Sequence, residues 1–487
     1  MVLAFHSPVQ AVDGDPGIPF RDPDWSQEDE VWDVAVSADG SVVVVSVFDE
    51  LIVYDSSGNI LWTWSDEDYT VTAVDISDDG NVVVAAILIW WYWIEIEPQG
   101  TESLRVANSD FSGTQEDDGM PFSVLLYWKN AKNLTDTPDP DWSSEELWGP
   151  ISQEALAVSS NGDQVVVVGT GPNVFYWNGA LSRSGVDEQT TWNDNLGYQL
   201  EHVKISDDGD TVAILGYTWG FDDANAYVYK NCTSRTGVLS TDFNLTYFFN
   251  LTNLDYFWDI DDWISRYLAM SDDGNYVVIG LEDMIYFFST DSSDGWNPLW
   301  TCQLGDDEWV AGVDISEDGN TVVAVTNTFE ESPTSLSIFH GATSKTDPVT
   351  PNYEFTGAEF YTDEDYFDVS LDNAGELAVA GTGDYLFAVN ATNGEPLWYY
   401  NGSWPDVSMM VRVSEDGNAV VSAGSEMDTL YYFSLEEEPP PEPEPEPPKA
   451  VGGILLASEV TTFLGTLVVA LSAAALALVI AVRRKQL

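Results

Sequence analysis

The feature that most constrains this chain is a short phrase, close to Val-x-Val-Ser-x-Asp-Gly-Asn followed by a run of valines, which returns eight times. In each copy an apolar alternation meets a Ser/Asp/Gly turn and then a second apolar run, which is the pattern of a tight β-hairpin. The copies begin at Val34, Val74, Leu156, Val203, Leu268, Val313, Asp368 and Val411. A hairpin that recurs in this way must stack on its neighbours to bury its faces, so the repeat predicts an all-β array.

Further strands follow the hairpin in most copies. An aromatic third strand is exemplified by ELIVYD from Glu50 and MIYFFS from Met284, and three copies add a fourth strand with a Leu-Trp signature, such as GNILWTW from Gly58. Four antiparallel strands per repeat describe the blade of a β-propeller. We therefore expect an all-β propeller over residues 20–435, with eight blades, or seven if one copy is degenerate.

The runs LIVYDSSGNILWTW and YLFAVNATNGEPLWYY resemble the repeat of the quinoprotein-dehydrogenase-like (PQQ-like) propellers, and the hairpin signal is shared with the WD40-like repeat superfamily. The resemblance covers Val31 to Leu435 as architecture, and its full motif appears in three of the eight copies. It implies a propeller fold. The redox members of that family hold their cofactor with a vicinal cysteine disulfide and a calcium site, and this chain has no Cys-Cys pair, so the resemblance points to a non-catalytic member.

Closure of the ring is predicted by a second repeat. The phrase DPDWS occurs at Asp22–Ser26 and again at Asp139–Ser143, where it occupies the place of an outer strand at the end of the second blade. The last copy of the hairpin stops after three strands at Leu435. We expect residues 20–30 to supply its fourth strand, because pairing the two ends of the chain would remove open sheet edges.

The C-terminal region predicts a membrane anchor. Val460 to Val482 is a run of 23 residues without a charge, ending directly in Arg483, Arg484 and Lys485, and such a run is long enough to cross about 30 Å of hydrocarbon. We expect a transmembrane helix over residues 454–482 that inserts through residues 460–482. The basic flank places the tail, residues 483–487, in the cytoplasm and the propeller outside the plasma membrane as a single-pass protein.

An acidic, proline-rich stretch, residues 436–453, separates the propeller from this anchor and favours a stiff stalk or a disordered linker. Residues 1–19 have an apolar start without a basic region, and we interpret them as an N-terminal segment, a candidate remnant of an export signal. Surface exposure agrees with six sequons for N-glycosylation, at Asn133, Asn231, Asn244, Asn250, Asn390 and Asn401.

The net negative charge of the chain excludes strongly anionic partners. The chain carries 83 Asp and Glu against 15 Lys and Arg, a formal net charge of −68, which repels nucleic acid and anionic lipid headgroups. Such a surface is typical of salt-adapted cells, and we expect an archaeal or otherwise halophilic source. The two cysteines, Cys232 and Cys302, lack metal-ligand spacing and either form one disulfide or remain two separate buried thiols.

The candidate site lies on the innermost strands, two positions before the repeated serine, where most neighbours are apolar. Five of the eight residues there are charged: Asp75, Lys204, Asp314, Asp368 and Arg412. Buried charges must be paired, so they favour an ion-paired belt at the central channel, with a cation or a small polar ligand as the alternative. The acidic turns invite calcium, but valines and alanines stand where a calcium loop needs oxygens, and we expect no cofactor.

These patterns favour a cell-surface propeller that acts as a non-enzymatic binding or scaffolding module for protein or carbohydrate. Only three histidines are present, which disfavours a histidine metal site or a Ser-His-Asp triad. Two alternatives stay open: a secreted metal-assisted hydrolase or lactonase with carboxylates in the central funnel, and a surface-coat component.

Overall fold

The repeated phrase forms a tight turn between two strands. In the first copy the hydroxyl of Ser37 donates to Oδ1 of Asp39 at 2.8 Å, and the backbone N–H of Val42 donates to Oγ of Ser37 at 3.1 Å. Gly40 follows with φ +65°, and a Cβ there would lie 2.4 Å from Cβ of Ala419 in another blade. The serine and aspartate therefore satisfy the backbone of the turn, and the glycine allows both its conformation and the close approach of a neighbour.

The computed structural model describes residues 18–89, 122–169, 171–187, 190–196, 199–217, 224–238, 245–248, 267–291, 297–305, 308–328, 335–347, 349–356, 368–381, 385–400, 410–424 and 427–435. The predicted stalk, transmembrane helix and tail, residues 436–487, lie outside these ranges, as does most of the N-terminal segment. Within the described ranges no helix combines the length and the apolarity needed to span a bilayer.

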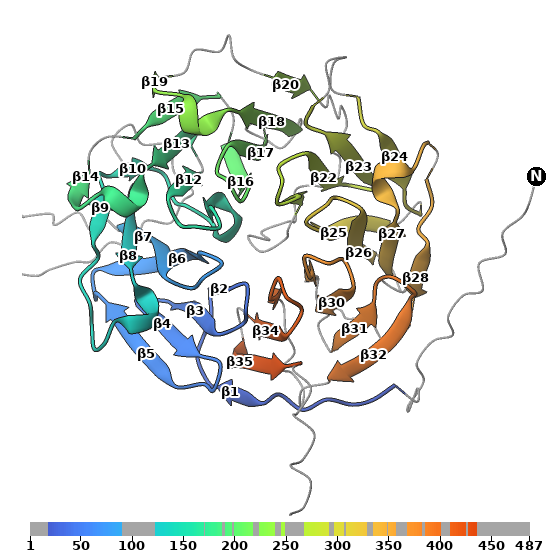
Figure 1. Ribbon diagram of the computed structural model, residues 1–487, viewed down its shortest axis with the longest axis horizontal. Coiled ribbons are helices and arrows are strands. Elements are labelled where there is room, and N and C mark those ends of the chain that lie inside the picture. Colours follow the sequence, from blue (N-terminus) through green and yellow to red (C-terminus); the bar gives the residue numbers. More distant parts are fainter. Residues whose placement is uncertain are drawn as a thin grey trace, which may run out of the picture. The chain divides into compact units, whose positions relative to one another are not determined.

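Eight sheets follow one another around a central axis, which confirms eight blades over the alternative of seven (Figure 1). From the inside outwards, blade 1 contains β2 (Asp33–Val36), β3 (Val42–Val47), β4 (Glu50–Asp55) and β5 (Ile60–Ser65), and blade 2 contains β6 (Tyr69–Ile76), β7 (Val82–Ile89), β8 (Phe122–Lys129) and β9 (Trp142–Ser144). Blade 3 contains β11 (Leu156–Val158), β12 (Gln164–Val168), β13 (Asn173–Asn178) and β15 (Trp192–Asn195), and blade 4 contains β16 (Gln199–Ile205), β17 (Thr211–Tyr217), β18 (Ala224–Lys230) and β20 (Leu245–Phe248).

Blades 5 to 8 repeat the order. They comprise β21 (Leu268–Met270), β22 (Tyr276–Leu281), β23 (Met284–Ser289) and β24 (Trp300–Gln303); β25 (Glu308–Ile315), β26 (Thr321–Thr328), β27 (Ser335–His340) and β28 (Tyr353–Thr356); β29 (Asp368–Leu371), β30 (Leu377–Gly381), β31 (Leu386–Asn390) and β32 (Glu395–Tyr400); and β33 (Met410–Val413), β34 (Ala419–Gly424), β35 (Met427–Ser434) and β1 (Trp25–Gln27).

The N-terminal strand closes the ring as the repeated DPDWS phrase predicts. Strand β1 pairs antiparallel with β35, with Trp25 opposite Tyr432, and the two rings stack with centroids 5.1 Å apart. Phe20 forms a further bridge to Tyr399 of blade 7. The last blade therefore takes its outer strand from the other end of the chain, which joins blade 8 to blade 1 through the covalent chain.

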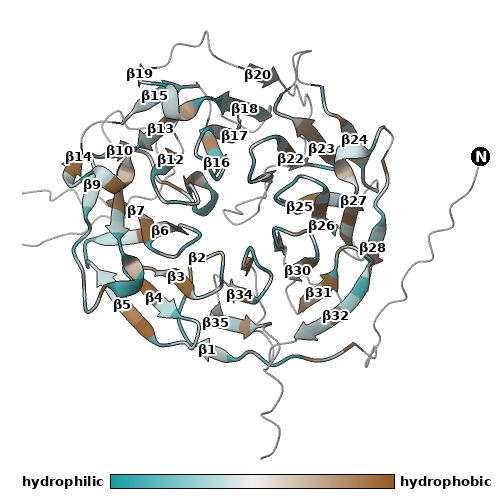
Figure 2. Cartoon of the chain, in the orientation of Figure 1, coloured by the Kyte–Doolittle hydropathy of each residue, from teal (hydrophilic) through white to brown (hydrophobic). Residues whose placement is uncertain are grey.

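The core lies between blades. Both faces of the middle strands are buried, and Val42, Val43, Val44 and Val45 are each at most 1% exposed. This is why the second apolar run of each repeat is an unbroken series of valines and does not alternate with polar residues. Each apolar cluster combines side chains of neighbouring blades, and the hydrophobic strands form the bodies of the blades while the loops are polar (Figure 2).

Tryptophans on outer strands dock one blade on the next. In four joints the indole Nε1–H donates at 2.8–3.2 Å to the carbonyl of a small residue in a one-turn 3-10 helix of the following blade: Trp62 to Ala131, Trp142 to Ala180, Trp192 to Cys232 and Trp300 to Ala342. The described residues show a similar bond from Trp25 to the carbonyl of Ser56 at 3.0 Å. The two DPDWS phrases thus place their tryptophans in corresponding roles.

The possible disulfide between Cys232 and Cys302 is not formed, because both residues are free, buried thiols. Cys232 belongs to η4 (Cys232–Ser234) and occupies the small-residue position that alanine fills at Ala131, Ala180 and Ala342. Cys302 lies on the outer strand of the following blade, opposite Ile285. Each cysteine therefore acts as a small apolar side chain at a blade joint.

Candidate binding channel

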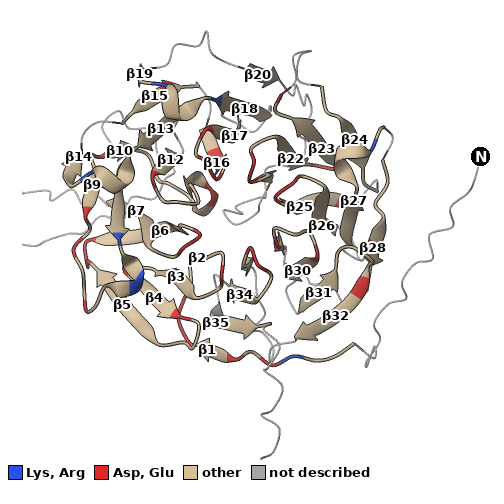
Figure 3. Cartoon of the chain, in the orientation of Figure 1, with Lys and Arg blue, Asp and Glu red and all other residues tan. Residues whose placement is uncertain are grey.

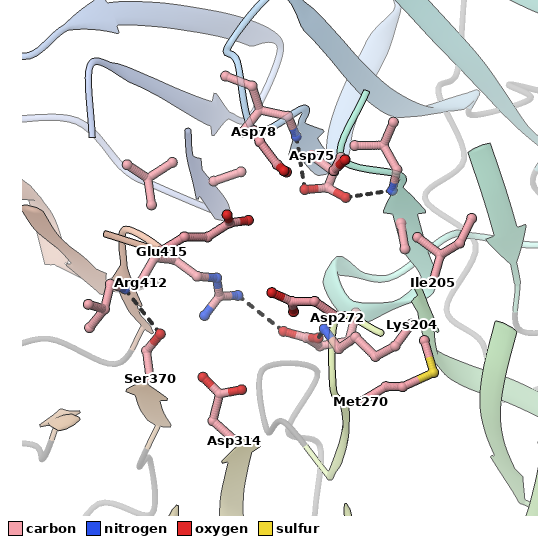
Figure 4. Close-up of a pocket in the computed structure, with 18 of the residues that line it drawn as sticks. Asp75, Asp78, Lys204, Ile205, Met270, Asp272, Asp314, Ser370, Arg412 and Glu415 are labelled. Carbon is pink, nitrogen blue, oxygen red and sulfur yellow. Dashed lines mark hydrogen bonds and ion pairs between the residues drawn. The ribbon is translucent and has the colours of Figure 1, made fainter. Parts of the chain in front are cut away.

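A cavity of about 280 Å³ occupies the centre of the ring, lined by the innermost strands and by the turns that follow them. Acidic residues gather on the inner turns around it (Figure 3). Of the five charged residues predicted from the sequence, Asp75, Lys204, Asp314 and Arg412 line the cavity (Figure 4), and Asp368 accepts a hydrogen bond from Arg412. All five residues belong to innermost strands of their blades.

Four aspartates of these strands hold neighbouring blades together through backbone groups. In each, Oδ1 accepts the N–H of the next residue and Oδ2 accepts an N–H from the following blade, at 2.7–3.0 Å: Asp33 to Val74, Asp75 to Val158, Asp314 to Leu371 and Asp368 to Val411. A carboxylate that accepts two backbone donors satisfies groups that would otherwise be buried without a partner. These four carboxylates are parts of the blade joints.

Asp368 belongs to a different level of the channel from the one the sequence assigned. In blade 7 the residue that accepts the turn N–H bonds is Asp372, which replaces the serine of other blades, because the N–H of Leu377 donates to its Oδ1 at 2.9 Å. Asp368 therefore stands four residues before the turn, in the position of Asp33, and Ser370 takes the position of Asp75 and Asp314. The sequence assignment was wrong by two residues, because Ser370 was taken for the repeated serine, whose position is occupied by Asp372.

Arg412 is the centre of an ion-pair network that crosses the channel. Its Nη1 lies 2.7 Å from Oδ2 of Asp368, and its Nη2 lies 3.1 Å from Oε1 of Glu154 and 3.9 Å from Oδ1 of Asp33. The other oxygen of Glu154 lies 2.5 Å from Nζ of Lys204. The network joins blades 1, 4, 7 and 8 and the link between blades 2 and 3, and it gives its buried charges partners of opposite sign.

Two members of this network, Asp33 and Glu154, were not predicted from the sequence. Asp33 could have been found by looking four positions before the turn as well as two. Glu154 lies in η2 (Gln153–Ala155), in the link between two blades, where no periodic pattern marks an inward-facing position. Its side chain reaches the channel from outside the repeat.

A second ring of residues surrounds one mouth of the channel. It consists of the residue that follows the repeated serine in each turn: Ala38, Asp78, Ser160, Asp207, Asp272, Glu317, Asn373 and Glu415. Backbone N–H groups join seven neighbouring pairs of turns, from Ala38 to Asp78 at 3.0 Å onwards and finally from Asp416 back to Ala38 at 3.1 Å. Among the described residues, the turns of Asp272 and Glu317 are the one neighbouring pair without such a bond. Five of the eight side chains are acidic, so the mouth combines an almost complete circuit of backbone hydrogen bonds with concentrated negative charge.

Burial and mutual repulsion keep protons on this mouth. Desolvation by burial, reinforced by neighbouring carboxylates, raises the pKa of Asp207 to about 6, of Asp272 to about 8 and of Glu415 to about 9. Asp78 and Glu415 share a side-chain hydrogen bond, and burial raises the pKa of Asp78 as well. Deeper in the channel, burial raises the pKa of Asp33 to about 8 despite the nearby Arg412, and that of Asp75 to about 6. The channel therefore holds neutral and ionised carboxyl groups side by side near pH 7.

Other predicted sites fall outside the channel. In the described part of the chain, no group of three or more His, Cys, Asp or Glu has an arrangement that could hold a metal ion. The sequon residues Asn133 and Asn231 are exposed and Asn390 is half-buried, while Asn244, Asn250 and Asn401 lie outside the described residues. The acidic turns bond to their own serines and backbone, as in the first copy, and these bonds account for their aspartates.

Comparison with known proteins shows the fold alone. No protein-family model matches the chain, and no curated protein matches it. Among solved structures, the C-terminal WD40 domain of Sif2 is 10% identical, with a TM-score of 0.55 over 86% of this chain and 99% of that one. The β-propeller domain of Cps50 (Swd1) from Myceliophteria thermophila is also 10% identical, with a TM-score of 0.45 over 84% and 97%. The chain has the fold of a WD40-like β-propeller.

Proposed function

We propose that the protein is a cell-surface, membrane-anchored propeller that acts as a non-enzymatic binding or scaffolding module for protein or carbohydrate. The observation that carries this proposal is that the charged side chains of the channel are bonded to other groups of the protein. Asp33, Asp75, Asp314 and Asp368 bind backbone N–H groups of two blades, and Arg412 and Lys204 are paired. Side chains bonded in this way stabilise a rigid ring. The loops that such a ring holds in place are the surfaces through which a propeller binds its partners.

The anchor and the location belong to the same proposal. Residues 460–482 and the basic tail support a single-pass protein with the propeller outside the cell, and the net charge of −68 supports a salt-adapted, archaeal source. The exposed sequons Asn133 and Asn231 support glycosylation. The Leu-Trp outer strands β5 and β32 support a relation to the PQQ-like propellers. Protease added to intact cells should digest the propeller; complete protection would place it inside.

A hydrolase or lactonase is the second candidate, favoured by the hydrogen-bonded pair Asp78 and Glu415, in which burial raises both pKa values. Neutral and ionised carboxyls in one mouth are the arrangement that general acid–base catalysis uses. The purified full-length protein should show no turnover on a panel of esters, lactones and glycosides, and no stoichiometric metal by elemental analysis. Turnover that is abolished in Glu415→Gln but kept in the exposed control Glu376→Gln would replace the binding proposal by the enzyme. Self-association of the glycosylated protein would instead support a surface coat.

A further inference from the structure

An aromatic residue occupies a turn position at which bulky side chains are unusual. Phe48 is the first residue of the two-residue turn between β3 and β4, with φ +40°. Bulky side chains are disfavoured at positive φ, and such turns prefer Asn, Asp or Gly. Of the five non-glycine residues with positive φ in the described ranges, three are Asn or Asp, and the other two are Phe48 and Glu282.

The strained backbone at Phe48 has a structural reason that does not involve its side chain. Its carbonyl accepts the N–H of Val71 in blade 2 at 2.6 Å. The carbonyl of Glu282, at the same turn of blade 5, accepts the N–H of Val310 in blade 6 at 2.7 Å. The turn therefore serves a blade joint, and blade 5 shows that a glutamate fulfils this role.

The side chain of Phe48 forms an exposed aromatic surface. It is 52% exposed, and its ring lies edge-on to that of the half-buried Trp32, with centroids 5.9 Å apart. An acidic rim adjoins the patch defined by Phe48 and Trp32. Asp49 is the second turn residue, and the N–H of Asp66 donates to the Asp49 carbonyl at 3.3 Å, so the turn from Asp66 to Tyr69, which contains the exposed Glu67 and Asp68, is bonded to the turn of Phe48. In the described part of the chain, no Lys or Arg forms an ion pair with Asp49, Glu67 or Asp68.

We propose that this patch is the docking site for an arginine side chain in a basic segment of a partner protein. A guanidinium group stacks on an aromatic face and at the same time pairs with carboxylates, which is the combination that Phe48, Trp32 and their acidic rim present. The charge of the patch complements such a segment, and the rest of the surface attracts it over longer distances. This inference rests on the proposed binding function and names its partner chemistry.

The test uses full-length protein in nanodiscs and a fluorescein-labelled octapeptide of alternating Gly and Arg, with binding measured by anisotropy at about 0.15 M salt. Phe48→Glu keeps the turn chemistry of blade 5 and adds a negative charge. Loss of the stacking surface should weaken binding by about 3- to 30-fold in this variant. Phe48→Tyr, which keeps an aromatic face, should bind like the wild type.

Non-specific attraction of the peptide to an acidic protein predicts the opposite change in affinity for Phe48→Glu. If charge alone binds the peptide, Phe48→Glu will bind it as tightly as the wild type or more tightly, and the inference is wrong. Leu299→Glu, at a 41% exposed residue of blade 5, adds the same charge elsewhere and should leave affinity unchanged. Thermal unfolding of each variant checks the fold. The result is independent of the turnover panel, so failure here leaves the binding function itself untouched.

Discussion

At the scale of single residues, the channel shows how an acidic chain uses its few cations. Arg412 lies within 4 Å of three carboxylates, from blade 1, blade 7 and the link between blades 2 and 3, although its side chain is only 16% exposed. Lys204 and Arg412 share Glu154, one on each oxygen. Removing one partner from such a network leaves the others buried without compensation, which costs more than the network itself contributes.

Replacing Arg412 by Met should therefore lower the free energy of unfolding by about 3–5 kcal/mol, measured by urea denaturation. Adding Glu154→Gln to this variant should recover part of the loss, because the glutamate charge no longer repels the buried carboxyl of Asp33, although Lys204 then loses its partner. Strictly additive effects of the two substitutions would show that Arg412 and Glu154 are not coupled.

At the scale of elements, each joint is built from a tryptophan on one blade and a small residue on the next. At Cys232 the site is fully buried, and burial raises the pKa of the thiol to about 12, so it stays protonated and unreactive. Such joints were not predicted, because the one-turn 3-10 helices lie in connections of unequal length. The hairpins were predicted because each carries its own turn chemistry and apolar runs.

Cys232→Ala should cost no more than about 1 kcal/mol, since alanine fills this position in three other blades. Cys232→Leu should cost about 1–3 kcal/mol by overpacking the space under Trp192. Thermal unfolding of both variants, with Ala180→Leu as the matched change in another blade, compares them. Equal stability of the alanine and leucine variants would contradict a tight joint.

Strand β1 should contribute at least about 2 kcal/mol to the free energy of unfolding, because it pairs with the edge of β35 and its Trp25 ring stacks on Tyr432. Deleting residues 1–30 removes it, whereas deleting residues 1–17 does not and serves as the control. Hydrogen exchange should show faster exchange in β35 for the longer deletion alone. Unchanged protection of β35 would mean that closure does not depend on this strand.

At the scale of the whole molecule, the sequence predicted the ring, its eight repeats and its closure, because these follow from periodic patterns and a duplicated phrase. It placed four of the five channel charges at the right level, and misplaced Asp368 because one serine imitated another. Glu154 could not be predicted from the sequence, since only the folded ring brings the segment that connects two blades into the channel. Periodicity predicts what each blade repeats, while a network that crosses the ring depends on differences between blades.

The acidic mouth should make stability fall as pH rises. The folded state keeps protons on Asp272 and Glu415 up to about pH 8 and 9, whereas the unfolded chain releases them near pH 4, so unfolding is favoured progressively through this range. Between pH 7 and 9 Asp272 alone should contribute about 1 kcal/mol. Melting temperatures of the wild type should decline over this interval, and those of Asp272→Asn should decline less.

Two controls isolate this effect. The buried His202, whose pKa is lowered to about 4 by burial, stays neutral above pH 7 and does not contribute. Asp318→Asn, at an exposed residue outside the mouth, should run parallel to the wild type. If Asp272→Asn also runs parallel, the mouth does not retain protons in the folded state.

The backbone circuit at the mouth has an electrostatic consequence of its own. Every N–H in it points to the next turn in the same rotational sense, from Ala38 to Asp78 and onwards around the ring. Peptide dipoles arranged head to tail in a circle cancel, whereas the aligned dipoles of a helix add to a pole at each end. Because seven of the eight junctions at the mouth follow this circular arrangement, the backbone dipoles there largely cancel, and the field at the mouth is set mainly by which side chain follows each repeated serine.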